Sequence, residues 1–106
     1  MKRLTAERNL RSIIERLERR ITEPEVVIKS VFLFGSMLTD KPNPGDIDLA
    51  LEYRSNLFSE YPFYYAAKAV DQALVRLRKG MKRVSFHSLS EIYEFKYPCK
   101  QIWPIQ

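Results

Sequence analysis

Long apolar runs are absent from this chain of 106 residues, and so are internal repeats and low-complexity segments. A helix that crosses a bilayer needs about 20 consecutive apolar residues, and no stretch here approaches that length. The first 20 residues lack the uninterrupted apolar run that a secretory signal requires. Cysteine occurs once, at Cys99, and a single thiol can form no internal disulfide. These absences predict a cytoplasmic protein that does not contact membranes.

The composition of the chain is ordinary for a small globular protein. Apolar residues make up 45% and charged residues 29%, which predicts one core in a single domain over residues 1–106. The formal net charge is +5, with basic patches in residues 1–20 and in a second cluster. The members of that cluster are Arg76, Arg78, Lys79, Lys82 and Arg83. Such patches can bind nucleic acids, but neither comes with a base-reading motif, so solvated helix faces are the favoured interpretation.

Hydrophobic periodicity predicts the order α-β-β-α-β-α. Apolar residues recur at helical spacing over 5–20 and 62–79, and Thr5 is the expected N-cap of the first helix. Runs of β-branched and aromatic residues predict strands over 26–34, 46–53 and 83–87. A last helical turn, capped by Ser88 or Ser90, is expected to run through Phe95. The predicted fold class is α+β (α/β mixed), a small mixed sheet with helices packed on it.

The C-terminal tail contains Ile102, Trp103 and Ile105 in a short apolar stretch with two prolines. We expect this tail to pack within the domain. A contact with a second copy of the chain or with a partner protein is the alternative, because interfaces are enriched in Trp and Tyr.

The first candidate site residues are Gly35 and Ser36, which directly follow a predicted buried strand. A glycine there lets the backbone turn sharply and brings amide N–H groups close to a ligand. If a helical turn begins at Ser36, its free N–H groups favour a phosphate, and the serine hydroxyl adds one donor. Taken alone, such a pair is typical of an ordinary turn.

Two further candidates, Asp46 and Asp48, lie two residues apart in the next predicted strand, so both side chains are expected on one face. Paired carboxylates repel each other and bury no apolar surface. A hard cation such as Mg²⁺ would neutralise them and bridge to phosphate oxygens. The structural alternative is that Asp46 ends the preceding turn and Asp48 faces solvent.

Gly35-Ser36, nine residues and then Asp46-Ile47-Asp48 resemble the signature of the nucleotidyltransferase superfamily, which includes DNA polymerase β. The chain looks most like a minimal nucleotidyltransferase, and the resemblance covers most of its length. It implies that Gly35 and Ser36 hold the phosphates of a nucleoside triphosphate, with ATP as the expected nucleotide. It also implies that Asp46 and Asp48 bind Mg²⁺ or Mn²⁺, and that a third carboxylate on the next strand completes the site. The implied reaction transfers a nucleoside monophosphate to a hydroxyl group.

The sequence departs from this pattern on the third strand. Ser85 stands where the third carboxylate is expected, and no Asp or Glu occurs between Ala73 and Ser90. His87 has the same parity as Ser85, so it is either a ligand or a partly buried polar residue. Many members of the family have an arginine after Gly-Ser, where this chain has Met37. We therefore expect nucleotide or metal binding more readily than catalysis.

Three functions follow as alternatives. The chain is a nucleotidyltransferase with a weakened site that acts on a hydroxyl of a small molecule or a protein. Alternatively, it is an inactive partner-binding module, since proteins that resemble it commonly act as antitoxins to a helical HEPN-domain toxin. A nucleic-acid-binding protein is the third and least favoured interpretation, because base-reading motifs are missing. The small size of the domain favours a protein partner or a homo-oligomer over a free-standing enzyme.

Overall fold

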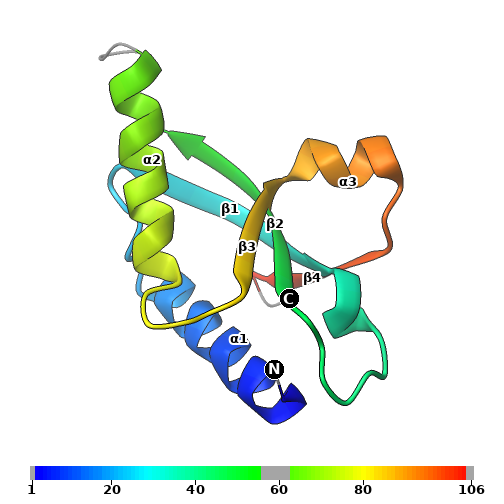
Figure 1. Ribbon diagram of the computed structural model, residues 1–106. Coiled ribbons are helices and arrows are strands. Elements are labelled where there is room, and N and C mark those ends of the chain that lie inside the picture. Colours follow the sequence, from blue (N-terminus) through cyan, green and yellow to red (C-terminus); the bar gives the residue numbers. More distant parts are fainter. Residues whose placement is uncertain (1, 56–62, 105–106) are drawn as a thin grey trace.

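A computed structural model describes residues 2–55 and 63–104, with the side chains of residues 55 and 63–66 excepted. The described residues form three α-helices, four strands and one 3₁₀ turn, which Figure 1 shows. They are α1 (Arg3–Glu18), β1 (Val26–Phe34), η1 (Gly35–Leu38), β2 (Ile47–Ser55), α2 (Phe63–Leu77), β3 (Val84–Ser88), α3 (Leu89–Phe95) and β4 (Cys99–Trp103). Pro62, the expected first residue of the second helix, lies outside the described residues.

The four strands form one mixed sheet in the order β3-β2-β1-β4 (Figure 1). Strand β1 pairs antiparallel with both β2 and β4. Strands β2 and β3 are parallel, and α2 lies in the connection between them. A parallel pair needs such a crossover, because its two strands run in the same direction. The predicted α+β class with a mixed sheet is confirmed.

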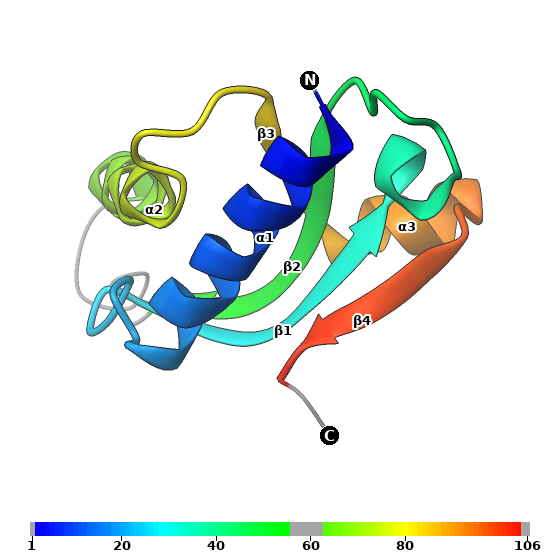
Figure 2. The same cartoon turned by 90° about the horizontal axis from the view of Figure 1, so that it is seen from below.

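The sheet has two faces of different character, because side chains alternate along each strand. We call the side of Ile47, Leu49 and Leu51 the core face, since these residues belong to the main cluster with residues of α1 and α2. Figure 2 shows α1 and α2 on the same side of β1 and β2. We call the opposite side the site face; it holds Asp48 and a smaller cluster in which Ala50 packs with residues of β1 and α3.

The first helix begins earlier than the sequence predicts. Its N-cap is Lys2, so the expectation that Thr5 caps this helix is wrong. The Arg3 backbone N–H donates to the Pro42 carbonyl at 3.0 Å, and the Arg3 side chain donates to the carbonyls of Thr39 and Lys41. The carbonyl of Pro42, in a loop distant in sequence, therefore accepts a backbone N–H from the first turn of α1, which a capping side chain would otherwise do.

The C-terminal tail forms the edge strand β4, which the predicted order did not contain. Its first three residues are exposed, so the tail shows no alternating apolar pattern. Ile102 and Trp103 pack against the main core, and the Trp103 indole N–H donates to Glu18 Oε1 at 2.9 Å. The expected packing of the tail within the domain is confirmed for these two residues, whereas Ile105 lies outside the described part of the chain.

The remaining boundaries agree with the expected ranges to within a few residues. Strand β1 covers the predicted range 26–34, and β2 starts at Ile47, one residue after Asp46. Ser88 occupies the N-cap position of α3, without a hydrogen bond from its side chain to the helix. Among the described helices, none has the length and apolar character that crossing a membrane would take.

Candidate functional site

Gly35 connects the end of β1 to turn η1 and lies against the carboxylate of Asp48. Its φ of +76° belongs to the left-handed region, which a residue with a side chain adopts at a cost. A β-carbon placed on Gly35 would lie 2.5 Å from Asp48 Oδ2, which is shorter than any real contact. Glycine is therefore required here both for the turn and for the approach of the carboxylate.

Ser36, in turn η1, forms hydrogen bonds with the backbone of Asp46, the residue that precedes β2. Its hydroxyl donates to the Asp46 carbonyl at 3.1 Å and accepts the Asp46 backbone N–H at 3.5 Å. The nine-residue spacing between Ser36 and Asp46 thus closes a loop. The hydroxyl proton, which the sequence analysis assigned to a phosphate, has an internal acceptor in this structure.

The two aspartates occupy different positions at this edge of the sheet. Asp46 precedes β2 and is exposed, whereas Asp48 lies within β2 and its side chain is 25% exposed. Asp48 pairs with Phe34 at the end of β1 on one side and with Ser85 of β3 on the other. Over residues 2–55 and 63–104, no group of three or more His, Cys, Asp and Glu side chains is placed so that it could hold a metal ion.

Ser85 lies beside Asp48 in the parallel pairing of β2 and β3. This is the strand position from which a third carboxylate would reach a cation held by Asp48. Ser85 provides a neutral hydroxyl there. The site therefore has less negative charge than the family pattern implies.

His87 lies on the same face and is placed between two carboxylates. Its Nε2 lies 3.5 Å from Asp48 Oδ1, and its Nδ1 lies 3.0 Å from Glu91 Oε2. The ring packs edge-on against Phe34, with 5.1 Å between the ring centroids. His87 Nε2 is shielded from solvent and has no hydrogen-bond partner among the described residues.

Glu91 is a site residue that the sequence analysis did not assign. It lies in the first turn of α3, three residues after the N-cap Ser88. A serine followed three residues later by glutamate is typical of a capping box, which would have predicted the start of this helix. The structure instead places the Glu91 carboxylate on His87, a contact that helix-capping rules do not predict.

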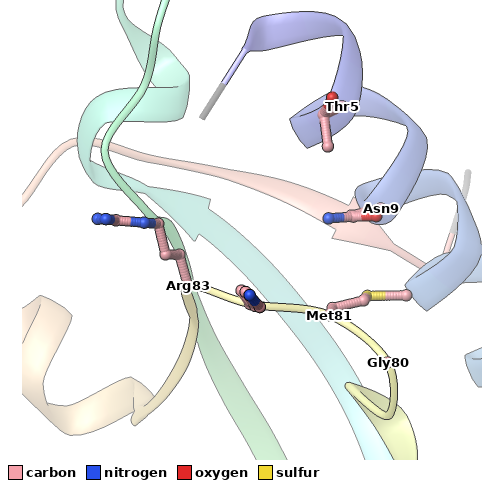
Figure 3. A pocket seen from close by; sticks show the side chains of 6 residues that line it. Thr5, Asn9, Gly80, Met81 and Arg83 are labelled. Carbon is pink, nitrogen blue, oxygen red and sulfur yellow. The ribbon is translucent and has the colours of Figure 1, made fainter.

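The backbone of Arg83 contacts the middle residue of the Asp-Ile-Asp segment. The Arg83 carbonyl accepts the backbone N–H of Ile47 at 2.8 Å, and Arg83 has a φ of +59°. In Figure 3 its side chain points away from Asn9 and Met81, toward the side of the view that carries η1 and α3. From the sequence, Arg83 is expected in the second basic cluster and at the start of the third strand; in the structure β3 begins one residue later, at Val84.

A cavity of about 400 Å³ lies between the start of α1 and the loop that joins α2 to β3, and Figure 3 shows the side chains that line it. Its lining residues are Thr5, Asn9, Gly80, Met81, Lys82 and Arg83. None of the residues predicted from the Gly-Ser and Asp-Ile-Asp motifs lines it. Met37, the residue after the Gly-Ser pair, is buried in the main core.

Comparison of the chain with models of protein families, with curated proteins and with solved structures finds no match.

Proposed function

We propose that this chain binds a nucleoside triphosphate, with ATP as the expected nucleotide, together with a divalent cation at the edge formed by Gly35, Asp46 and Asp48. The observation that carries the proposal is the approach of the Asp48 carboxylate to Gly35, at a place from which a β-carbon would displace that carboxylate. A triphosphate needs backbone N–H groups that it can approach and a cation that bridges its oxygens. A glycine turn beside a carboxylate supplies both requirements.

The donor set fits a hard cation. Asp46 and Asp48 offer carboxylate oxygens, the ligands that Mg²⁺ prefers, and Mn²⁺ accepts the same oxygens. Ser36 keeps Asp46 at this edge through its two backbone contacts. With two carboxylates from the protein, phosphate oxygens and water have to fill the remaining coordination positions. The cation would neutralise phosphate charge when it is bound.

Transfer of a nucleoside monophosphate is the reaction that such a site would serve. The oxygen of an acceptor hydroxyl would bond to the α-phosphorus while the bond to pyrophosphate breaks, and the hydroxyl proton would leave to a base. Ser85 beside Asp48 provides no carboxylate for that proton or for a second cation. We therefore expect the site to bind the nucleotide but to transfer the nucleoside monophosphate slowly.

A different observation supports a second candidate function, an inactive module that binds a partner protein such as a HEPN-type toxin. Aromatic side chains of and next to α3 are exposed: Tyr93 to 72%, Phe95 to 59% and Tyr97 to 48%. Tyr97 stacks on Phe34, with 5.8 Å between the ring centroids, so this aromatic group adjoins the candidate site. Protein interfaces are enriched in such residues.

Calorimetric titration of ATP with Mg²⁺ tests the proposed binding. We expect Asp48→Asn to weaken the affinity by more than about tenfold, because it removes a charged ligand of the cation. Asp40→Asn is the matched control, since it makes the same chemical change in the exposed loop between Ser36 and Asp46. Equal affinity of the two variants, or no binding to the folded wild-type protein, would overturn the proposal.

A further inference from the structure

His87 is held by Glu91 in an orientation that leaves one ring nitrogen without a hydrogen-bond partner among the described residues. An ionised carboxylate accepts hydrogen bonds and cannot donate them. The contact between His87 Nδ1 and the Glu91 carboxylate therefore places a proton on Nδ1. In the neutral ring, Nε2 then carries a lone pair. That nitrogen is shielded from solvent and has no hydrogen-bond partner among the described residues.

The group opposite this lone pair is the carboxylate of Asp48, at 3.5 Å. Two electron-pair donors that face each other at this distance repel. A doubly protonated ring would form an ion pair with Asp48 at this distance, without a hydrogen bond between Nε2–H and the carboxylate. A cation between the two atoms would satisfy both of them.

We propose that His87 Nε2 and Asp48 Oδ1 are ligands of one divalent metal ion of the Zn²⁺ or Co²⁺ type. The proposal rests on the proposed function for the position of the nucleotide, and it adds at Asp48 a site for an ion that accepts nitrogen. Imidazole suits zinc and cobalt, whereas Mg²⁺ takes oxygen ligands.

Distance and surroundings agree with this assignment. Two ligands with bonds of about 2.1 Å to a tetrahedral ion lie about 3.4 Å apart, close to the observed 3.5 Å. Histidines that bind metals nearly always donate the other ring N–H to a carboxylate or carbonyl, which is the role Glu91 takes on Nδ1. Glu91 is therefore a positioning residue in this site.

The protein supplies two ligands, in agreement with the lack of any group of three or more ligating side chains over the described residues. The other coordination positions fall to water and to oxygens of a bound triphosphate. We therefore expect ATP and the metal ion to strengthen each other's binding.

The chain offers a direct probe, because His87 is its only histidine. The imidazole nitrogens seen in a ¹H–¹⁵N NMR spectrum of uniformly labelled protein therefore all belong to His87. Tag-free protein with Cys99→Ser is the suitable background, since the exposed thiol of Cys99 is itself a zinc ligand. Zn²⁺ alone is titrated first, and Mg²⁺ is titrated in parallel.

The expected result is an unprotonated Nε2 whose resonance shifts on addition of Zn²⁺ and stays unchanged with Mg²⁺. His87→Ala and Asp48→Asn should abolish zinc binding measured by calorimetry. Glu91→Gln should weaken it about 10–100-fold by loosening the ring. Glu94→Gln, on the same helix and exposed, should leave it unchanged.

Protonation of both ring nitrogens together with indifference to Zn²⁺ would overturn the inference, because His87 would then be an imidazolium between Asp48 and Glu91. The wild-type spectrum gives this answer even if His87→Ala fails to fold. ATP binding with Zn²⁺ that His87→Ala leaves intact would also overturn it, whereas ATP binding with Mg²⁺ tests the proposed function by itself. A zinc shift at Nε2 without any ATP binding would support the metal site and remove the proposed function.

Discussion

The core face and the site face of the sheet differ in chemical character, although alternating residues of the same strands form them. On the core face, Ile47, Leu49 and Leu51 are almost fully buried under the helices α1 and α2. On the site face, Asp48 and His87 remain partly exposed and place charged or polar atoms close together. Burial on the first face stabilises the fold, and the second face keeps groups that contribute little to stability but suit a ligand.

Alternation along β2 is what makes this division possible. A shift of one residue in the pairing of β2 would exchange the two faces, bury Asp48 and expose Leu49. The large apolar cluster of the core face therefore also determines the direction of the site carboxylate. If this account is right, substitutions on the two faces should change different measured quantities.

The largest effect on stability is expected from Leu49→Ala. Leu49 is fully buried, and its truncation leaves a cavity that costs about 2–5 kcal/mol of the free energy of unfolding. Glu52→Ala, on the exposed part of the same strand, should change that free energy by less than about 0.5 kcal/mol. Urea unfolding of both variants measures the difference, and equal losses would contradict the assignment of the core face.

Gly35→Ala should damage both stability and binding. The left-handed backbone costs an alanine about 1–2 kcal/mol, and the new methyl group must displace the Asp48 carboxylate. Gly80→Ala is the matched control, because Gly80 has a φ of +82° but open space where a β-carbon would stand. We expect both variants to lose stability in urea unfolding, whereas Gly35→Ala alone should lose ATP affinity in calorimetry. If the Gly35→Ala variant still bound ATP with the wild-type affinity, the turn at Gly35 would not be part of the nucleotide site.

Ser85→Asp, on the site face, should change stability less than the substitutions above. Its main effect should be on cation binding and on nucleotidyl transfer. A carboxylate beside Asp48 costs about 0.2–1 kcal/mol through repulsion, and a bound divalent cation should reverse that loss. The variant should also transfer label from α-³²P-ATP to an acceptor protein faster than the wild type does. Ser90→Asp, on α3, controls for the added charge. A folded Ser85→Asp variant that transfers no faster than the wild type would remove Ser85 from the third ligand position.

Sequence reasoning located the parts of the fold that local pattern determines. The run of β-branched and aromatic residues predicted the bounds of β1 correctly, because seven of its nine residues are apolar and most of these are of types that favour strands. The mixed sheet followed from the order of the elements. The placement of Ser85 opposite Asp48 on neighbouring strands agrees with the strand register that the motif implied.

What the sequence did not predict depends on contacts between distant segments. The start of α1 at Arg3 is set by the carbonyl of Pro42, and β4 forms by pairing its exposed residues with β1. The contact of His87 with both Asp48 and Glu91 needs the register of two strands and the turn into α3 at once. No local pattern contains that information.

The most direct test compares two neighbours in β2, Ile47→Val on the core face and Asp48→Asn on the site face, by titrating each with ATP and Mg²⁺. The account predicts that Ile47→Val keeps the wild-type affinity while it loses about 0.5–1.5 kcal/mol of stability. It predicts that Asp48→Asn loses the affinity and keeps the stability. Wild-type affinity in a folded Asp48→Asn variant would contradict the claim that the site face binds the nucleotide.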